Sequence, residues 1–258
     1  ALAASKLNID VAHIEAGLRS FNRLMPEEIN RIVTDVIADY LFCPTELAVK
    51  NLAAEGITSN VYQVGDVMYD ALIRFTGIAE TTSNILSALD LTGREYYLMT
   101  IHRPVNADNR AQMIQLLKEL SSSPCELVFP VHPRVKKQLL NLGMKQHPRI
   151  KFIEPVGYLD MLVLEKNAKA IITDSGGVQK EAYLHRVPCL TLRKETEWKE
   201  TVADGWNTLV KDFRELPHLL TNLPEPRNWQ PHYGEGRAAD QIVTILSRIG
   251  ENCGRDRG

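Results

Sequence analysis

The chain has 258 residues, of which 44% are hydrophobic and 24% charged, and this balance is that of an ordinary globular protein with one large core or two smaller ones. Its formal net charge is −2 and it contains no basic block, which argues against nucleic acid as a partner and favours a small ligand bound locally. Because it has no leader-like segment and no apolar run of roughly eighteen residues, we expect a cytoplasmic protein with no membrane partner.

The first part of the chain alternates short apolar runs with helical patterns. Residues 1–7 have the pattern of a helix end without a start signal, so we expect the natural protein to begin further upstream. A strand is predicted over residues 8–15. A helix opens at Pro26, because proline at the first helical position followed by two glutamates is a strong start signal. The next predicted elements are a strand over 41–44, a helix over 46–55 and a strand over 61–65.

A stretch rich in Thr, Ser and Asn over residues 76–95 predicts a domain boundary, which we place after residue 78. The alternation then restarts, with strands predicted over 96–101, 126–131, 150–153, 170–174, 189–192 and 208–210. Helices are predicted between them near 110–120, 134–142, 159–167, 178–185 and 198–204, and a last amphipathic helix over 238–249. This alternation predicts parallel sheets covered by helices on both faces. We expect a partial first domain (1–78), a complete doubly wound second domain (79–235), and a C-terminal helix and tail (236–258).

Polar side chains gather where the predicted strands end. In open α/β sheets ligands bind beyond the carboxyl ends of the strands. The residues found there are Glu15, His102, Arg103, His132, Arg134, Asp174, Ser175, Arg193 and Glu197. So many strand ends supplied with polar groups predict a binding site at that edge of the sheet.

The stretch from residue 170 to residue 182 is a buried strand that turns into a helix at Gly176 and Gly177. The free N–H groups at the start of such a helix, together with its dipole, favour an anion such as phosphate, and Ser175 adds a hydroxyl. Glu181 lies in the second turn, where it could accept hydrogen bonds from a ribose diol. The plain alternative is that Ser175 only caps the helix and Glu181 is a solvated surface residue. Both interpretations remain open on these residues alone.

The most distinctive segments of the chain are 13–19 (HIEAGLR), 25–31 (MPEEINR), 100–103 (TIHR), 130–133 (PVHP), 173–181 (TDSGGVQKE) and 193–198 (RKETEW). In this order they resemble the non-hydrolysing UDP-N-acetylglucosamine 2-epimerases, over residue 1 to about residue 210. Members of that family begin with a phosphate loop and an aspartate-containing turn that are absent here, so the resemblance implies an N-terminally truncated chain. The family continues after residues 102–103 with a Glu-Asn pair where this chain has PVN, which leaves the orientation of that loop open.

The resemblance implies two Rossmann-like doubly wound domains, arranged as in the B-type glycosyltransferases (GT-B), with the first domain incomplete. UDP would be held mainly by the second domain. Ser175, Gly176 and Gly177 would meet the pyrophosphate, and Glu181 would bind the ribose. No metal or other cofactor is implied.

Five further residues receive roles from the same resemblance. His102 and Arg103 would lie by the leaving diphosphate. His132 would serve a second, activating UDP-sugar site, or would only end its strand. Arg193 and Glu197 would close over the nucleotide, or would simply pair with each other, which is the favoured alternative for these two.

The implied reaction interconverts UDP-N-acetylglucosamine and UDP-N-acetylmannosamine for surface polysaccharide, in a protein that we expect to be a homodimer. The C2 proton of a sugar is not acidic, so inversion there requires the bond from C1 to the diphosphate to break as a base removes the proton. Elimination gives a glycal and UDP, and re-addition with protonation on the opposite face gives the 2-epimer. This chemistry requires carboxylates near C2 and hydrogen-bond donors for the departing phosphate.

Glu15 and Glu27 are the candidate acid/base residues, and His102 is the third catalytic candidate. The alternative for Glu15 is an ion pair with Arg19, and that for Glu27 is stabilisation by the helix dipole alone. His102 could instead be a core histidine bonded to a backbone carbonyl. Two other functions compete with the epimerase: a truncated fragment that binds nucleotide sugar without turnover, and a GT-B glycosyltransferase that requires an acceptor.

Overall fold

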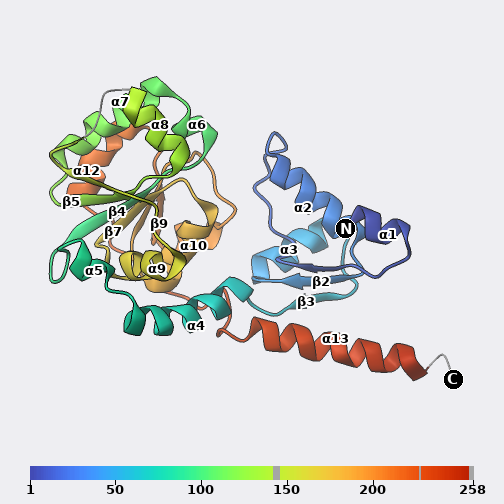
Figure 1. Ribbon diagram of the computed structural model, residues 1–258. Coiled ribbons are helices and arrows are strands. Elements are labelled where there is room, and N and C mark those ends of the chain that lie inside the picture. Colours follow the sequence, from blue (N-terminus) through green and yellow to red (C-terminus); the bar gives the residue numbers. More distant parts are fainter. Residues whose placement is uncertain (142–145, 227, 256–258) are drawn as a thin grey trace. The chain divides into compact units, whose positions relative to one another are not determined.

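The computed structural model of the protein describes residues 1–141, 146–226 and 228–255 (Figure 1). The chain forms two compact units, one made of Ala1–Arg74 with Pro231–Gly258 and the other of Phe75–Gln230. Their boundary lies within a continuous helix, α4 (Val67–Thr82), in which the predicted boundary after residue 78 also falls. The Thr-rich stretch after residue 76 is therefore helical as far as Thr82, and the hydroxyls of Thr81 and Thr82 are satisfied by the carbonyl of Ile78.

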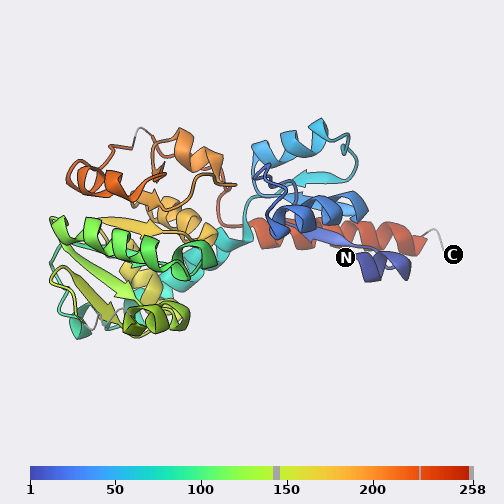
Figure 2. The same cartoon turned by 90° about the horizontal axis from the view of Figure 1, so that it is seen from above.

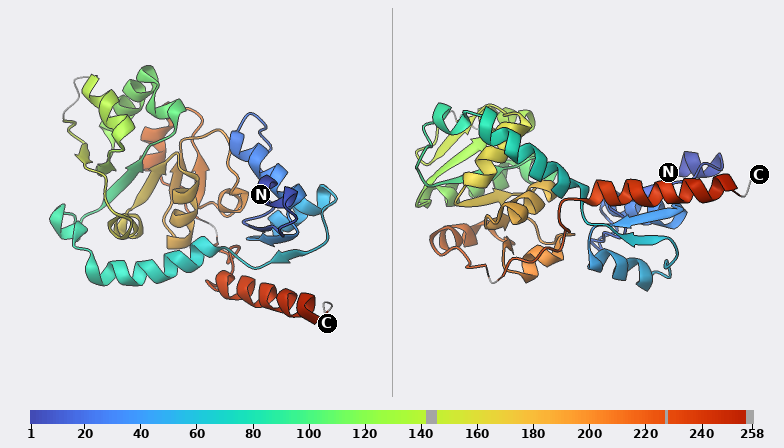
Figure 3. Two further views of the ribbon diagram at one scale, coloured as in Figure 1. Left: turned by 45° about the vertical axis from the view of Figure 1, so that its right-hand side comes forward. Right: turned by 90° about the horizontal axis from the view of Figure 1, so that it is seen from below.

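The first unit contains a parallel sheet in the order β1 (Ala12–Ile14), β2 (Tyr40–Cys43) and β3 (Val61–Gln63). Its helices are α1 (Leu2–Lys6), α2 (Pro26–Ile37), α3 (Glu46–Ala54) and α13 (Ala238–Arg255). In Figures 1 and 3, α2 and α13 lie on opposite sides of this sheet. Ile242 of α13 packs with Phe42 and Val64 in a buried cluster. The C-terminal helix, which the sequence analysis set apart from both domains, thus packs on the first unit.

The strand predicted over residues 8–15 is shorter in the structure. Asn8 and Glu15 have left-handed backbone conformations, with φ of 54° and 66°. The N–H of Ile9 donates to the carbonyl of Ala4, so this part of the chain still belongs to the turn that ends α1. Extended backbone requires negative φ, and β1 is therefore confined to residues between these two turns.

The second unit, seen from above in Figure 2, is built of strands and surrounding helices. Its sheet has six parallel strands in the order β6-β5-β4-β7-β8-β9. The strands are β4 (Tyr96–Thr100), β5 (Glu126–Pro130), β6 (Ile150–Ile153), β7 (Ala170–Thr173), β8 (Cys189–Thr191) and β9 (Asn207–Leu209). The order reverses between β4 and β7. In doubly wound sheets such a switch point opens a crevice beyond the carboxyl ends of the two strands. This confirms the predicted α/β doubly wound fold and locates the region where a ligand is expected.

Helices cover both faces of the larger sheet. They are α5 (Ile85–Ala88), α6 (Pro104–Ala107), α7 (Arg110–Glu119), α8 (Pro133–Asn141), α9 (Tyr158–Asn167), α10 (Gly176–His185), α11 (Lys199–Ala203), α12 (Leu216–Thr221) and the 3-10 turns η1 (Leu120–Ser122) and η2 (Phe213–Glu215). Residue 142, the predicted end of the helix at 134, lies outside the described residues.

Alternate residues of β4 enter two separate cores. Tyr97 and Met99 pack with residues of α7, α8 and α12, whereas Tyr96 and Leu98 pack with residues of α9 and α10. Strands covered in this way are apolar on both faces, which explains their continuous apolar runs in the sequence. In the described part of the chain, no helix is both long and apolar enough to span a membrane.

Candidate functional site

Asp174 holds the switch point of the larger sheet together. It directly follows β7, its side chain is fully buried, and it faces the residues that follow β4. Its Oδ1 accepts from the backbone N–H of His102 at 3.1 Å, and its Oδ2 accepts from that of Arg103 at 3.1 Å. The Nδ2 of Asn106 donates to the same carboxylate at 3.0 Å. The ends of the two central strands are thereby tied to each other.

The same carboxylate orients the His102 ring, whose Nδ1 lies 3.1 Å from Oδ1 of Asp174. Burial alone would raise the pKa of Asp174, but hydrogen bonds from His102 and Asn106 outweigh it and hold the pKa below its usual value. Since an ionised carboxylate only accepts, Nδ1 carries a proton, and Nε2 is the nitrogen left for a ligand. The His102 side chain is 47% exposed, so it is not the buried core histidine of the alternative interpretation.

The loop after Arg103, whose orientation the sequence left open, is well fixed. Residues 104–107 form the short helix α6, and Asn106 donates from Nδ2 both to Asp174 and to the carbonyl of Leu192, at 3.0 and 3.3 Å. The roles of Asp174 and Asn106 were not predicted from the sequence. A signal was available for Asp174, because an acidic residue directly after a fully buried strand is rarely there for packing.

The predicted strand-to-helix turn is present. Ser175 is the N-cap of α10 and its Oγ accepts from the N–H of Val178 at 3.5 Å. The N–H groups of Gly176 and Gly177 occupy the first helical positions, where no partner exists within the helix. Neither glycine has a positive φ, so backbone freedom is not the reason for glycine here. A Cβ on Gly176 would lie 2.8 Å from Oε1 of Glu197, so a side chain at this position would fit only if that carboxylate moved.

A cavity of about 230 Å³ brings several of the predicted residues together within the second unit. Its lining residues are Thr100, Ile101, His102, Pro130, His132, Pro155, Val156, Met161, Ser175 and Val178. His132 is exposed and its Nδ1 accepts from the N–H of Arg134 at 3.3 Å, which also suits a residue that ends its strand. A larger cavity of about 630 Å³ in the first unit, between β3 and α13, is lined by none of the predicted site residues.

Glu181 is not the solvated surface residue of the plain alternative, because only 7% of it is exposed. The hydroxyl of Tyr158, the first residue of α9, donates to its Oε1 at 3.1 Å. Burial raises the pKa of Glu181, opposed by the Tyr158 hydrogen bond and the charge of Lys180. The carboxylate is thus held in one orientation by a neighbouring helix, as a ligand-binding group must be.

Behind Glu181 lies a second buried carboxyl group. Glu165 is completely buried, and within the described residues neither of its carboxyl oxygens has a hydrogen-bond partner. Burial, with the charge of Glu181 added, raises its pKa well above the usual value. Burial therefore favours the neutral form of the Glu165 carboxyl in the folded protein.

Glu165→Gln is therefore expected to stabilise the protein increasingly as pH rises. With the folded pKa raised, the contribution of Glu165 is fully present below its unfolded pKa and is lost as pH rises through the folded pKa. Glutamine has the same shape and no such loss. Urea unfolding from pH 5 to pH 9 measures the free energy of unfolding, and the difference between Glu165→Gln and wild type should grow as pH rises. Glu215→Gln, which changes an exposed residue, is the control. If the free energies of unfolding of Glu165→Gln and wild type changed with pH in parallel, a neutral Glu165 would be contradicted.

Arg193 and Glu197 form an ion pair at 2.9 Å, with side chains only 4% and 5% exposed. This is the alternative that the sequence favoured for them. Next to the pair lies a buried polar network that the sequence analysis missed. Gln179 accepts at Oε1 from the Thr196 hydroxyl at 2.7 Å and donates from Nε2 to the carbonyl of Ser175 at 3.0 Å. The segment between β8 and α11 is thereby fastened to the turn that begins α10.

In the first unit, Glu15 follows β1 and is half-buried, while Glu27 in the first turn of α2 is exposed. The φ of 66° at Glu15 is unusual for a residue with a side chain, and such strain collects at functional sites. The neighbouring Glu28 is 1% exposed and accepts from the N–H groups of Ser20 and Phe21 at 2.9 and 2.8 Å. Of the two adjacent glutamates, the second holds the loop and the first is left accessible.

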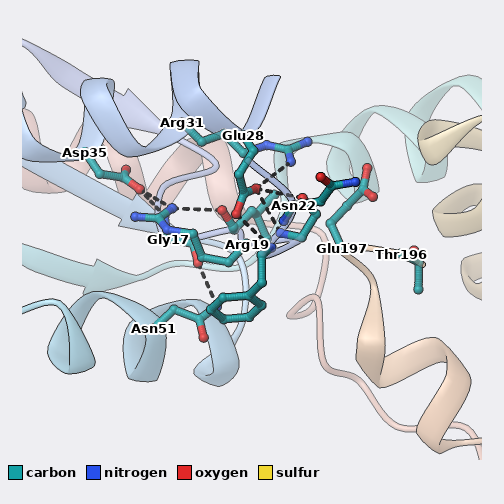
Figure 4. Close-up of polar contacts among 12 residues, drawn as sticks. Gly17, Arg19, Asn22, Glu28, Arg31, Asp35, Asn51, Thr196 and Glu197 are labelled. Atoms are coloured by element: carbon teal, nitrogen blue, oxygen red, sulfur yellow. Dashed lines mark hydrogen bonds and ion pairs between the residues drawn. The ribbon is translucent and has the colours of Figure 1, made fainter. Parts of the chain in front are cut away.

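Arg19, the partner considered for Glu15, lies in a buried cluster (Figure 4). It donates to both carboxylate oxygens of Glu55 at 2.7 Å and to Oδ2 of Asp35 at 2.6 Å. Asp35 also lies 2.6 Å from Nδ1 of His13 and accepts from the N–H of Gly17. The HIEAGLR segment is thus fixed at several points around Glu15.

Comparison with known proteins adds to this geometry. A protein-family model described as UDP-N-acetylglucosamine 2-epimerase matches residues 1–247. A UDP-N-acetylglucosamine 2-epimerase homolog of Methanococcus maripaludis is 48% identical, over 96% of this chain and 72% of that protein. A UDP-2,3-diacetamido-2,3-dideoxy-D-glucuronate 2-epimerase of Pseudomonas aeruginosa is 40% identical, over 96% and 71%.

Among solved structures, the chain is similar to the UDP-GlcNAc 2-epimerase of Methanocaldococcus jannaschii in complex with UDP-GlcNAc and UDP. The TM-score is 0.86 and the identity 45%, over 96% of this chain and 71% of that one. The enzyme of Neisseria meningitidis bound to UDP-GlcNAc gives a TM-score of 0.83 at 32% identity, over 96% and 72%.

Proposed function

Because the chain belongs to the UDP-N-acetylglucosamine 2-epimerase family, we propose that it interconverts UDP-N-acetylglucosamine and UDP-N-acetylmannosamine. One observation carries the proposal beyond the family. At the switch point of the larger sheet, Ser175, which is the N-cap of α10, and the oriented ring of His102 line one cavity. Such a place suits a diphosphate that departs and returns.

In the proposed reaction, a base removes the C2 proton while the bond from C1 to the diphosphate breaks, which gives a glycal and UDP. UDP then adds back at C1 as an acid protonates C2 on the opposite face. We assign the accessible Glu27 and the strained Glu15 to these proton transfers, since two carboxylates can serve the two faces.

The second unit supplies the nucleotide site in this proposal. Gly176 and Gly177 donate their N–H groups to the diphosphate, Ser175 adds its hydroxyl, and His102 supports the charge that develops on the leaving group. Arg103 adds a permanent positive charge beside it. Glu181, oriented by Tyr158, accepts from the ribose hydroxyls.

The test is turnover of UDP-N-acetylglucosamine alone in deuterated water. We expect the 2-epimer with one deuteron gained at C2 and no free sugar. Release of free N-acetylmannosamine with UDP would indicate a hydrolysing enzyme, and a requirement for an acceptor would indicate a glycosyltransferase. UDP binding without any turnover would indicate a fragment that only binds nucleotide sugar.

The same assay with UDP-2,3-diacetamido-2,3-dideoxyglucuronate decides between two substrate classes, since a relative that is 40% identical carries that activity in its name. We favour UDP-N-acetylglucosamine because the relative at 48% identity and the family model both bear its name.

The supply of surface polysaccharide, the cytoplasmic location and the homodimer are further parts of the proposal. Sedimentation of the purified protein checks the homodimer directly, and fractionation of cells checks the location.

A further inference from the structure

The Glu197 carboxylate lies at the start of α10. Its Oε2 accepts from Nη2 of Arg193 at 2.9 Å, and its side chain is only 5% exposed. Its Oε1 lies so close to Gly176 that an added Cβ would stand 2.8 Å away. One oxygen therefore belongs to the ion pair, and the other rests on the first residue of the helix.

This position is one that favours negative charge. The helix has ten residues, and its first N–H groups and dipole attract an anion. Buried cations add to the effect. Lys180 is completely buried with Nζ 4.3 Å from the ring centroid of Trp198, whose Nε1 is also next to Gly176. A carboxylate of the protein itself thus occupies a place that would suit a phosphate.

Arg193 supplies a second observation that points to an anion. Its side chain is 4% exposed, and among the described residues its Nη1 is buried with no hydrogen-bond partner. Leaving a buried guanidinium N–H unpaired is unfavourable, and a phosphate oxygen would satisfy it. Thr196, through Gln179 and the carbonyl of Ser175, keeps the segment that carries Glu197 against the same turn.

We propose that Glu197 is an internal anion that competes with the diphosphate for the start of α10 and makes the site selective for ligands charged enough to displace it. The inference rests on the proposed function, since it requires the nucleotide diphosphate to bind at this turn. Two negative groups cannot share the position, so binding moves the carboxylate off Gly176. The same movement frees Arg193 to donate to the ligand. A nucleoside without phosphate gains nothing from this exchange.

The direction in which one substitution changes the affinity for UDP tests this proposal. Glu197→Gln removes the competing charge and keeps the shape of the side chain, so UDP should bind about tenfold more tightly. Uridine, which carries no phosphate, should bind Glu197→Gln and wild type equally. Isothermal titration calorimetry of the whole chain at fixed ionic strength gives both affinities. Glu215→Gln, which removes an exposed carboxylate on η2, should bind UDP like the wild type.

If wild type binds UDP and Glu197→Gln binds it equally or more weakly, the internal competitor is excluded and the proposed function stands. If wild type binds no UDP, the proposed function itself fails. Should Glu197→Gln not fold, because Arg193 loses its ionised partner, Glu197→Asp serves instead. Its shorter carboxylate retains the charge but withdraws from Gly176, so tighter UDP binding is again expected, and unchanged or weaker binding again excludes the competitor.

Discussion

Asp174→Ala is expected to lower the free energy of unfolding of the second unit by about 3–5 kcal/mol and to abolish measurable UDP binding. The substitution removes the acceptor for the N–H groups of His102 and Arg103 and for the amide of Asn106, all in a buried place. It also releases the His102 ring, because Nδ1 loses the carboxylate that orients it. Urea unfolding and titration with UDP measure the two effects.

A second variant separates the charge of Asp174 from its shape, and a variant of an exposed aspartate serves as its control. Asp174→Asn keeps one acceptor oxygen, so we expect a smaller loss of stability, about 1–3 kcal/mol, with a folded protein whose UDP affinity can be measured. Asp108→Asn, which neutralises an exposed carboxylate at the end of α6, should change stability by less than about 0.5 kcal/mol. An Asp174→Asn protein with wild-type stability and UDP affinity would contradict the role of this carboxylate at the switch point.

Glu181→Gln is expected to weaken UDP binding by about 1.5–3 kcal/mol, roughly tenfold to more than a hundredfold. The loss reflects charge-assisted hydrogen bonds from the ribose hydroxyls, which a neutral amide replaces poorly. Glutamine is the better test than alanine, because Glu181 is buried and alanine would also leave the Tyr158 hydroxyl without its acceptor. Titration with UDP over a range of temperatures measures the affinity.

Tyr158→Phe is the matched control for this prediction. It removes the same hydrogen bond from the other side and leaves the carboxylate charge in place. We expect UDP affinity to fall by less than about tenfold, since the ribose hydroxyls still find an ionised acceptor. Equal losses in both variants would mean that orientation, and not charge, is what Glu181 contributes. Unchanged affinity in Glu181→Gln would remove the residue from the site.

The fold of the second unit could be predicted from the sequence because its strands are buried on both faces. Runs such as residues 170–172 are apolar throughout and are soon followed by turn residues, which distinguishes them from helices. The first strand of the chain was predicted too long, because the turns at its two ends are not evident from the residue types. Asn8 and Glu15 have left-handed conformations at its two ends, and neither residue type demands them.

At the site, the sequence could point to residues but not to their partners. Ser175 and Gly176 follow from the strand-to-helix turn, whereas the bond between Gln179 and Thr196 joins different elements 17 residues apart. Burial was equally hidden. Nothing in the sequence distinguishes the buried Glu28 from the exposed Glu27, because the two stand side by side in the first turn of α2. Whether a charged residue is buried depends on which distant segments of the chain pack over it, and the local sequence does not show this.

The switch point also governs how the protein acquires its site during folding. His102 and Asp174 are 72 residues apart in sequence, and they meet only when β4 and β7 pair in parallel. Pairing over such a separation is slow, because the entropy of closing the loop is lost before the contacts form. A nucleotide that needs both strand ends therefore has nothing to bind in the unpaired chain. It is expected to slow unfolding and to leave the refolding rate unchanged, because it binds only after the sheet has formed.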